Sequence, residues 1–269
     1  MNASQPIGIF DSGIGGLTVT QAVVQALPQE NIIYFGDTAH LPYGDKSAAA
    51  IQAYSVRIAE FLLQRRCKII LIACHTASST AYDLVKEYVG DKAIVINVID
   101  PMIHYLSEHY ANKKVGLIGT KQTIHSNIYG KKIDALNAGI VLSAHATPLL
   151  VNAIEEGFIN HPIINELLKE YLLHPTLQEI DALILGCTHY PIIKENIKTF
   201  FAPQVEIIDS STLVTTAVKT RLIHENLLNT EGKGDKQFLA SDYTEAFARC
   251  AKLFFGENIT LTHYPLWSS

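Results

Sequence analysis

Short runs of apolar residues alternate with longer amphipathic segments along the whole chain, and this alternation constrains the fold more than any other feature of the sequence. Several runs are apolar and β-branched at consecutive positions, as in strands that are buried on both faces. We expect strands at residues 7–11, 31–37, 68–74, 94–99, 115–119, 140–144, 182–187 and 205–209. Helical spacing predicts helices at residues 17–27, 48–64, 77–88, 101–110, 149–157, 163–173, 212–227 and 243–255. This alternation favours an α/β fold of parallel sheets joined by crossover helices.

One part of the pattern occurs twice. A strand, a cysteine, a Thr/His pair and a helix follow each other at Cys74 and again at Cys187, which predicts two similar α/β units that face each other. The residue before a proline tends to leave helical geometry, so Asp100-Pro101 is a plausible first crossing between the units. With a return crossing near residues 205–210, we expect one domain at 1–99 plus 209–269 and a second domain at 100–208.

Composition excludes several functional classes. A length of 269 residues fits one large or two modest domains, and a net charge of −5 without a long basic stretch argues against a nucleic-acid partner. The apolar runs are too short to cross a membrane, and the N-terminus does not have the pattern of a signal peptide. Four cysteines without C-x-x-C spacing predict reduced thiols in the cytoplasm and no metal site.

Ligands of open parallel sheets bind beyond the carboxyl ends of the strands, and the stretch GIFDSGIGGLTV marks the first such end. Asp11 and Ser12 close a strand, and Gly13, Gly15 and Gly16 form a tight entry to a helix. Such turns bind phosphate or carboxylate through free backbone N–H groups. The glycine spacing matches neither a dinucleotide fingerprint nor a P-loop, and a simple turn with a helix cap explains the stretch equally well.

A second strand end, FGDTAHLPYG, carries Asp37 and the loop Pro42-Tyr43-Gly44, which by itself is more typical of a turn. The remaining two ends are IILIACHTASS and ALILGCTHYP, in which Cys74 and Cys187 each stand where a strand meets a helix. We expect this position to lower the pKa of a thiol through the helix dipole and the unpaired N–H donors. A lone cysteine there is usually a buried apolar residue, but two equivalent ones favour chemistry.

Three kinds of chemistry use two facing thiols to different extents. A disulfide or metal site has no support from the ligand spacing. A cysteine hydrolase uses one thiolate with a histidine base and leaves the second thiol idle. In the third kind, one thiolate removes a proton from a carbon and the opposite thiol delivers a proton to the other face, which inverts a stereocentre without a cofactor.

The stretches IGIFDSGIGGLTV, Pro42-Tyr43-Gly44, LIACHTAS and LILGCTHYP resemble the glutamate racemases, a family of cofactor-independent amino-acid racemases, and the resemblance covers essentially the whole chain. It implies two α/β domains in pseudo-twofold relation with the substrate between them. It also implies interconversion of L- and D-glutamate, with D-glutamate supplied to peptidoglycan synthesis. The resemblance implies neither a cofactor nor a metal, and glutamate is the expected small-molecule partner. A homodimer is possible, but the sequence leaves the oligomeric state open.

The resemblance also implies roles for individual residues. Cys74 and Cys187 match the two acid/base residues, Asp11 matches a carboxylate beside the first thiol, and His189 matches an imidazole beside the second. Glu155 matches an acid that orients this histidine. The remaining matches contact the substrate, a set that includes Asp11 and His189 together with Ser12, Tyr43, Gly44, His75, Thr76, Thr120, Thr123 and Thr188.

His75 departs from the family pattern, which usually has Cys-Asn-Thr where this chain has Cys74-His75-Thr76. Histidine is larger than asparagine and titrates near neutral pH. We expect His75 to lie in the substrate shell and to change affinity or pH dependence, unless its ring is turned out of the pocket. For the chain as a whole, the sequence leaves open an aspartate racemase on the same scaffold, a catalytically silent binding protein and a thiol hydrolase.

Overall fold

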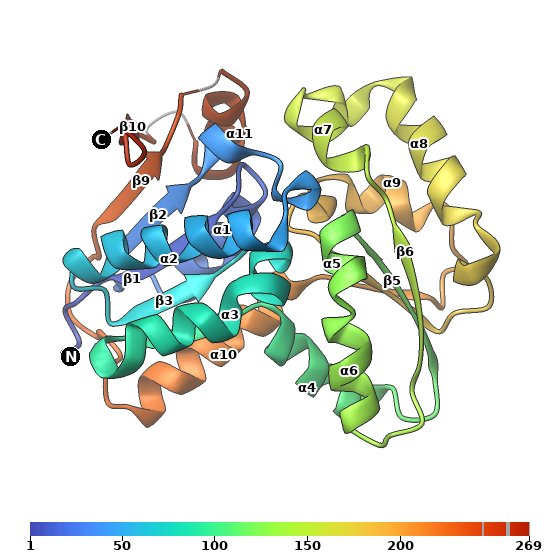
Figure 1. The fold of residues 1–269 in the computed structure, drawn as a ribbon, viewed down its shortest axis with the longest axis horizontal. Helices are drawn as coiled ribbons and strands as arrows, with labels where there is room; N and C mark the ends of the chain where they lie inside the picture. The colour runs from blue at the N-terminus through green and yellow to red at the C-terminus, as the bar shows by residue number, and fades with distance from the viewer. Residues whose placement is uncertain (244, 257–258, 269) are drawn as a thin grey trace.

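Two parallel β-sheets, each covered by helices, form two α/β domains (Figure 1). The computed structural model describes residues 1–243, 245–256 and 259–268, without the side chains of residues 246, 250 and 253. The first sheet has the order β10-β9-β2-β1-β3-β4 and the second has the order β6-β5-β7-β8. Their strands are β1 (Ile7–Asp11), β2 (Ile32–Gly36), β3 (Ile69–Ile72), β4 (Ile94–Asn97), β5 (Lys114–Gly119), β6 (Val141–Ala146), β7 (Ala182–Gly186), β8 (Glu206–Ile208), β9 (Lys236–Ala240) and β10 (Leu261–His263).

The helices connect and cover these strands. They are α1 (Gly16–Ala26), α2 (Ala48–Gln64), α3 (His75–Val89), α4 (Ile99–His109), α5 (Lys121–Ser126), α6 (Ile128–Ala135), α7 (Leu150–Glu155), α8 (Pro162–Leu172), α9 (Lys194–Lys198), α10 (Ser210–His224) and α11 (Glu245–Phe255). The strands named above pair in parallel throughout, which confirms the predicted α/β class. Among the described residues, none of the helices combines the length and the apolar character needed to cross a lipid bilayer.

Both faces of the first sheet are buried, which explains its consecutive apolar residues. Ile7 and Ile9 of β1 belong to the same core as Leu17 of α1, whereas Phe10 points to the opposite face and packs with residues of α2 and α3 such as Ile58. Successive side chains of a strand point to opposite faces. A strand between two helical layers therefore needs apolar side chains at every position.

The two sheets repeat one topology. The order β2-β1-β3-β4 in the first sheet corresponds to β6-β5-β7-β8 in the second, and Cys74 and Cys187 follow the corresponding strands β3 and β7. The strands of the first sheet come from residues 1–99 and 209–269, and those of the second sheet come from residues 100–208. We therefore keep the predicted division as our proposal for the domain boundaries.

The predicted strand at 94–99 is too long. Asn97 ends β4 because its Oδ1 accepts hydrogen bonds of 2.8 Å from the backbone N–H groups of both Ile99 and Asp100, which starts α4 at Ile99. Asp100 is therefore helical, contrary to the expectation from the following proline. Pro101 lies in the first helical turn, where a missing N–H is tolerated.

Several short elements are absent from the sequence prediction: β9, β10, α5, α6 and α9. Helices α5 and α9 span six and five residues, less than two turns, so they carry no readable periodicity. The strand β10 has three residues at the sheet edge, largely exposed, and needs no apolar run.

Candidate active site

A small enclosed cavity lies where residues after β1, β3, β5 and β7 meet between the two domains, and its volume is about 10 Å³. This is close to the room that one water molecule needs. Its lining brings together most of the site residues predicted from the sequence: Ser12, Tyr43, Gly44, Cys74, His75, Thr76, Thr120, Cys187, Thr188 and His189. Of the remaining predictions, Asp11, Thr123 and Glu155 lie behind this lining and contact it.

Two lining residues are missing from the prediction, Pro42 and Val151. Pro42 belongs to the Pro-Tyr-Gly loop that the sequence analysis singled out, so the loop motif could have identified it. Val151 is an apolar residue of α7 that looks like any core valine, and no feature of the sequence marks it.

Cys74 caps the N-terminus of α3. Its Sγ accepts a hydrogen bond of 3.5 Å from the backbone N–H of Ala77 and lies 3.9 Å from Oγ of Ser12. Burial raises the pKa of the Cys74 thiol well above its ordinary value, and the charge of Asp11 raises it further. The prediction of a lowered pKa is therefore wrong for Cys74, because desolvation of the thiolate outweighs one backbone N–H bond.

Cys187 follows β7, but a 3₁₀ turn (Tyr190–Ile193) comes next and not an α-helix, so the expected helix dipole does not act on this thiol. An imidazole takes that place. Nδ1 of His189 lies 3.6 Å from Sγ of Cys187, and Nε2 of the same ring lies 2.5 Å from Oε1 of Glu155. The second thiol thus stands at the end of a Glu155–His189–Cys187 chain, all buried.

The charge state of His189 results from opposing effects. Burial lowers the pKa of this imidazole, but the hydrogen bonds to Cys187 and Glu155 and the charge of Glu155 outweigh burial and raise the pKa well above its ordinary value. The raised pKa favours the imidazolium form of His189, in which both ring nitrogens carry protons and can donate, one to the sulfur and one to the carboxylate.

Asp11 is buried at the end of β1, and its carboxylate is fully engaged. Oδ2 accepts the backbone N–H groups of Gly13 and Gly16 at 3.1 and 2.9 Å, and Oδ1 accepts the hydroxyl of Thr188 at 3.2 Å. Burial raises the pKa of Asp11, although the charge of His189 and the two backbone N–H bonds act against it. The Thr188 contact joins the two domains through this carboxylate.

The glycine-rich turn closes against the second domain and is not a free anion cradle. Its N–H groups are used by protein carboxylates, since Gly13 and Gly16 bind Asp11 and Ile14 donates to Oε1 of Glu155 at 3.1 Å. A Cβ atom at Gly15 would lie 2.5 Å from both Nδ1 of His189 and Oγ1 of Thr188. Glycine is required there because the backbone of one domain touches side chains of the other.

Three threonine hydroxyls form a second bridge between the domains. Thr76 of α3 shares hydrogen bonds of 2.9 Å with Thr120 and 3.2 Å with Thr123, and the latter two are 3.0 Å apart. The loop around Gly44 packs directly on Thr120. The Tyr43 hydroxyl donates to Oδ2 of Asp37 at 2.6 Å, so this hydroxyl is held by the first domain.

His75 borders the cavity, but its ring nitrogens bind elsewhere. Nδ1 lies 2.9 Å from the Tyr129 hydroxyl and Nε2 lies 3.1 Å from Oγ of Ser210. Both partners are outside the cavity lining, so the ring is occupied by protein hydroxyls.

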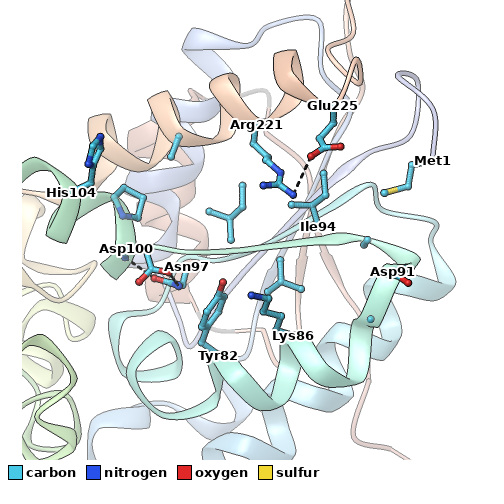
Figure 2. A pocket seen from close by; sticks show the side chains of 16 residues that line it. Met1, Tyr82, Lys86, Asp91, Ile94, Asn97, Asp100, His104, Arg221 and Glu225 are labelled. Atoms are coloured by element: carbon cyan, nitrogen blue, oxygen red, sulfur yellow. Dashed lines mark hydrogen bonds and ion pairs between the residues drawn. The ribbon is translucent and has the colours of Figure 1, made fainter. Parts of the chain in front are cut away.

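A much larger groove of about 660 Å³ lies along the edge strand β4 between α3 and α10 (Figure 2). Lys86 and Arg221 point into it from opposite sides, and Arg221 pairs with Glu225 at 3.1 Å. The described residues that line this groove include no cysteine, so it lacks the groups for the chemistry described above. In the part of the chain that the structure describes, no three His, Cys, Asp or Glu side chains are grouped to hold a metal ion.

Comparisons with known proteins agree with this geometry. A sequence profile described as Asp/Glu/hydantoin racemase matches residues 7–218. The glutamate racemase of Chlorobaculum parvum is 41% identical over 260 residues, which cover 96% of this chain and 95% of that protein. The crystal structure of a Francisella tularensis glutamate racemase in complex with D-glutamate has a TM-score of 0.89 at 40% identity and covers 99% of this chain and 100% of the other. A glutamate racemase isoform from Bacillus anthracis has a TM-score of 0.92 at 32% identity, with coverage of 98% and 99%.

Proposed function

This chain belongs to the Asp/Glu/hydantoin racemase family, and from this premise we propose that it interconverts L- and D-glutamate by two-thiol proton transfer at the α-carbon. One observation carries the proposal: Cys74 and Cys187, at corresponding strand ends of the two domains, line the same cavity. Inversion of a stereocentre needs a proton acceptor on one face and a proton donor on the other.

In one direction of this reaction, a thiolate takes the α-proton and becomes a thiol. The electron pair stays on the α-carbon, whose carbanion is then protonated on its opposite face by the other thiol. The enantiomer bound decides which cysteine acts as the base. Each turnover leaves the two sulfurs with exchanged protonation states, so the reverse reaction uses the same groups in swapped roles.

Different groups stabilise the thiolate forms of the two cysteines. The protonated His189 donates to Cys187 and is held by Glu155, which places a positive charge beside that sulfur. Cys74 has a raised pKa in the small cavity and is supported by the N–H of Ala77. We infer that the ammonium group of the bound amino acid supplies the positive charge that Cys74 lacks, since a nearby cation lowers the pKa of a thiol.

The described cavity lining holds no Lys or Arg side chain, so neutral donors would hold the two substrate carboxylates. The available donors are the hydroxyls and backbone N–H groups of Ser12, Thr76, Thr120 and Thr188, with Thr123 behind them. A space of about 10 Å³ does not accommodate glutamate, so binding requires the domains to separate. The Thr76–Thr120 and Asp11–Thr188 bonds are then exchanged for bonds to the substrate.

We further propose that the D-glutamate formed supplies peptidoglycan synthesis in the cytoplasm, a role that the resemblance to glutamate racemases implies. Aspartate is the second candidate substrate, because the same thiols would act on any acidic amino acid and only the depth of the cavity discriminates. Relatives at about 40% identity that are named glutamate racemases favour glutamate.

The test is incubation with L-glutamate in D₂O, following loss of the α-proton signal by NMR together with optical rotation. Cys74→Ser and Cys187→Ser are expected to lower turnover at least ~1,000-fold. Cys67→Ala is the matched control, because Cys67 is a buried thiol outside the cavity, and burial raises its pKa to about 12. Retained racemisation in either serine variant, or activity with aspartate alone, would refute the proposal.

A further inference from the structure

We propose that His75 is a positioning residue that fastens the first turn of α3, which carries Cys74 and Thr76, to the second domain through Tyr129. The inference rests on the proposed function for its kinetic consequence, and on the contacts of the imidazole ring for its geometry. It replaces the expected role of His75 as a substrate ligand with a structural tie that acts on the thiol beside it.

Both hydrogen-bonding atoms of the ring are committed to protein hydroxyls. Nδ1 meets Tyr129 of α6 at 2.9 Å, and Nε2 meets Ser210, the first residue of α10, at 3.1 Å. A neutral imidazole has one donor and one acceptor, and a hydroxyl can serve either. The ring therefore satisfies both partners at once and has no nitrogen left for a substrate.

The charge state of His75, and with it the tie, does not change over the working pH range. His75 is 1% exposed, and burial lowers its pKa to about 3 despite the charge of Asp209. The ring stays neutral and keeps both bonds, so His75 neither acts as a base nor switches with pH.

The Tyr129 hydroxyl depends on this bond. Tyr129 is 1% exposed, and within the described residues the bond to His75 is the one hydrogen bond found for its hydroxyl. A buried hydroxyl without a partner is destabilising, so losing the imidazole disfavours the arrangement that places Tyr129 of α6 against the first turn of α3.

The position of the tie gives it a catalytic consequence. Cys74, His75 and Thr76 are consecutive, and Thr76 makes the neighbouring contacts to Thr120 and Thr123 of the second domain. When the substrate takes over the Thr76 contacts, the His75–Tyr129 bond remains as the anchor between the turn that carries Cys74 and the domain that carries Cys187. Small displacements of a reacting group lower the rate strongly, so a loosened anchor should reduce kcat more than it changes KM.

The experiment is a double-mutant cycle with His75→Asn, Tyr129→Phe and the double variant, measured for kcat, KM and thermal stability with both glutamate enantiomers. Tyr129→Phe removes only the hydroxyl, and Tyr129 does not line the cavity. Each single variant is expected to lower kcat ~3- to 10-fold with little change in KM, and the double variant to be no slower than the slower single variant. Tyr105→Phe, which removes an exposed hydroxyl bonded to Glu206, is the control and should behave as wild type.

A second readout separates positioning from loss of stability. With α-deuterated glutamate, the kinetic isotope effect should rise in both single variants more for the enantiomer whose proton goes to Cys74 than for the other. A substrate-binding role for His75 predicts instead a raised KM in His75→Asn and unchanged kinetics in Tyr129→Phe, and this result would overturn the inference. If the wild-type protein is inactive on glutamate, the proposed function is refuted. The double-mutant cycle on thermal stability then tests the His75–Tyr129 bond by itself. Additive changes in Tm for His75→Asn and Tyr129→Phe would reject this bond.

Discussion

Nε2 of His189 lies 2.5 Å from Oε1 of Glu155, although one residue follows a strand of the second sheet and the other ends α7. The same Glu155 oxygen accepts the backbone N–H of Ile14 from the first domain. A single carboxylate thus fixes the imidazole beside Cys187 and holds the glycine-rich turn that closes the cavity. This double use predicts that Glu155 controls the charge of His189 as well as closure of the site.

Glu155→Gln is expected to move the alkaline limb of the kcat/KM profile to lower pH. The carboxylate helps to raise the pKa of His189, so a neutral amide lowers this pKa, and the imidazolium is lost earlier as the pH rises. We also expect kcat to fall about tenfold or more at the optimum. The measurement is a kcat/KM series across neutral and alkaline pH. Glu156→Gln, at the adjacent exposed position, should leave the profile unchanged, and an unmoved alkaline limb in Glu155→Gln would contradict the assignment.

Gly15→Ala is expected to lower kcat/KM about 100-fold while the protein still folds. The backbone of Gly15 is in the right-handed helical region, so alanine adds no backbone strain, but its Cβ would lie 2.5 Å from His189 and Thr188. The domains then cannot close fully on the substrate. Steady-state kinetics and circular dichroism check this together, and near-normal turnover in a folded variant would show that closure at Gly15 is unnecessary.

The neutral, buried His75 predicts an acid-sensitive contribution to stability. Its pKa is about 3 in the folded state and about 6.5 when unfolded. As pH falls below about 6.5, the unfolded state binds a proton that the folded state refuses, so stability is lost from about pH 6.5 toward about pH 3. Between about pH 7.5 and about pH 5, wild type should lose about 2 kcal/mol more than His75→Asn. Urea denaturation at both pH values measures this difference, and equal losses in the two proteins would exclude a neutral buried ring.

Much of the fold follows from local patterns. The runs around β1, β3 and β7 are apolar at nearly every position because the strands are covered on both faces, and burial on both faces leaves a signature in consecutive residues. Helix α2 occupies the predicted 48–64 segment, where Ser47 caps its first turn through a hydrogen bond from Ala50. The short elements α5, α9 and β10 lack such signatures because they span too few residues for a period to show.

The features of the candidate site also fall into those that the sequence predicts and those that depend on tertiary packing. The sequence alone determined that two cysteines end corresponding strands, and parallel strands bring their carboxyl ends to one edge of a sheet, so chemistry at that edge could be predicted. Only the tertiary structure decided that Cys74 has a raised pKa, that Cys187 pairs with an imidazole and that His75 binds Tyr129 and Ser210. Desolvation and hydrogen bonding depend on which distant segments surround a group, and that information is held by the packing of the whole chain and not by the neighbours of a residue in sequence.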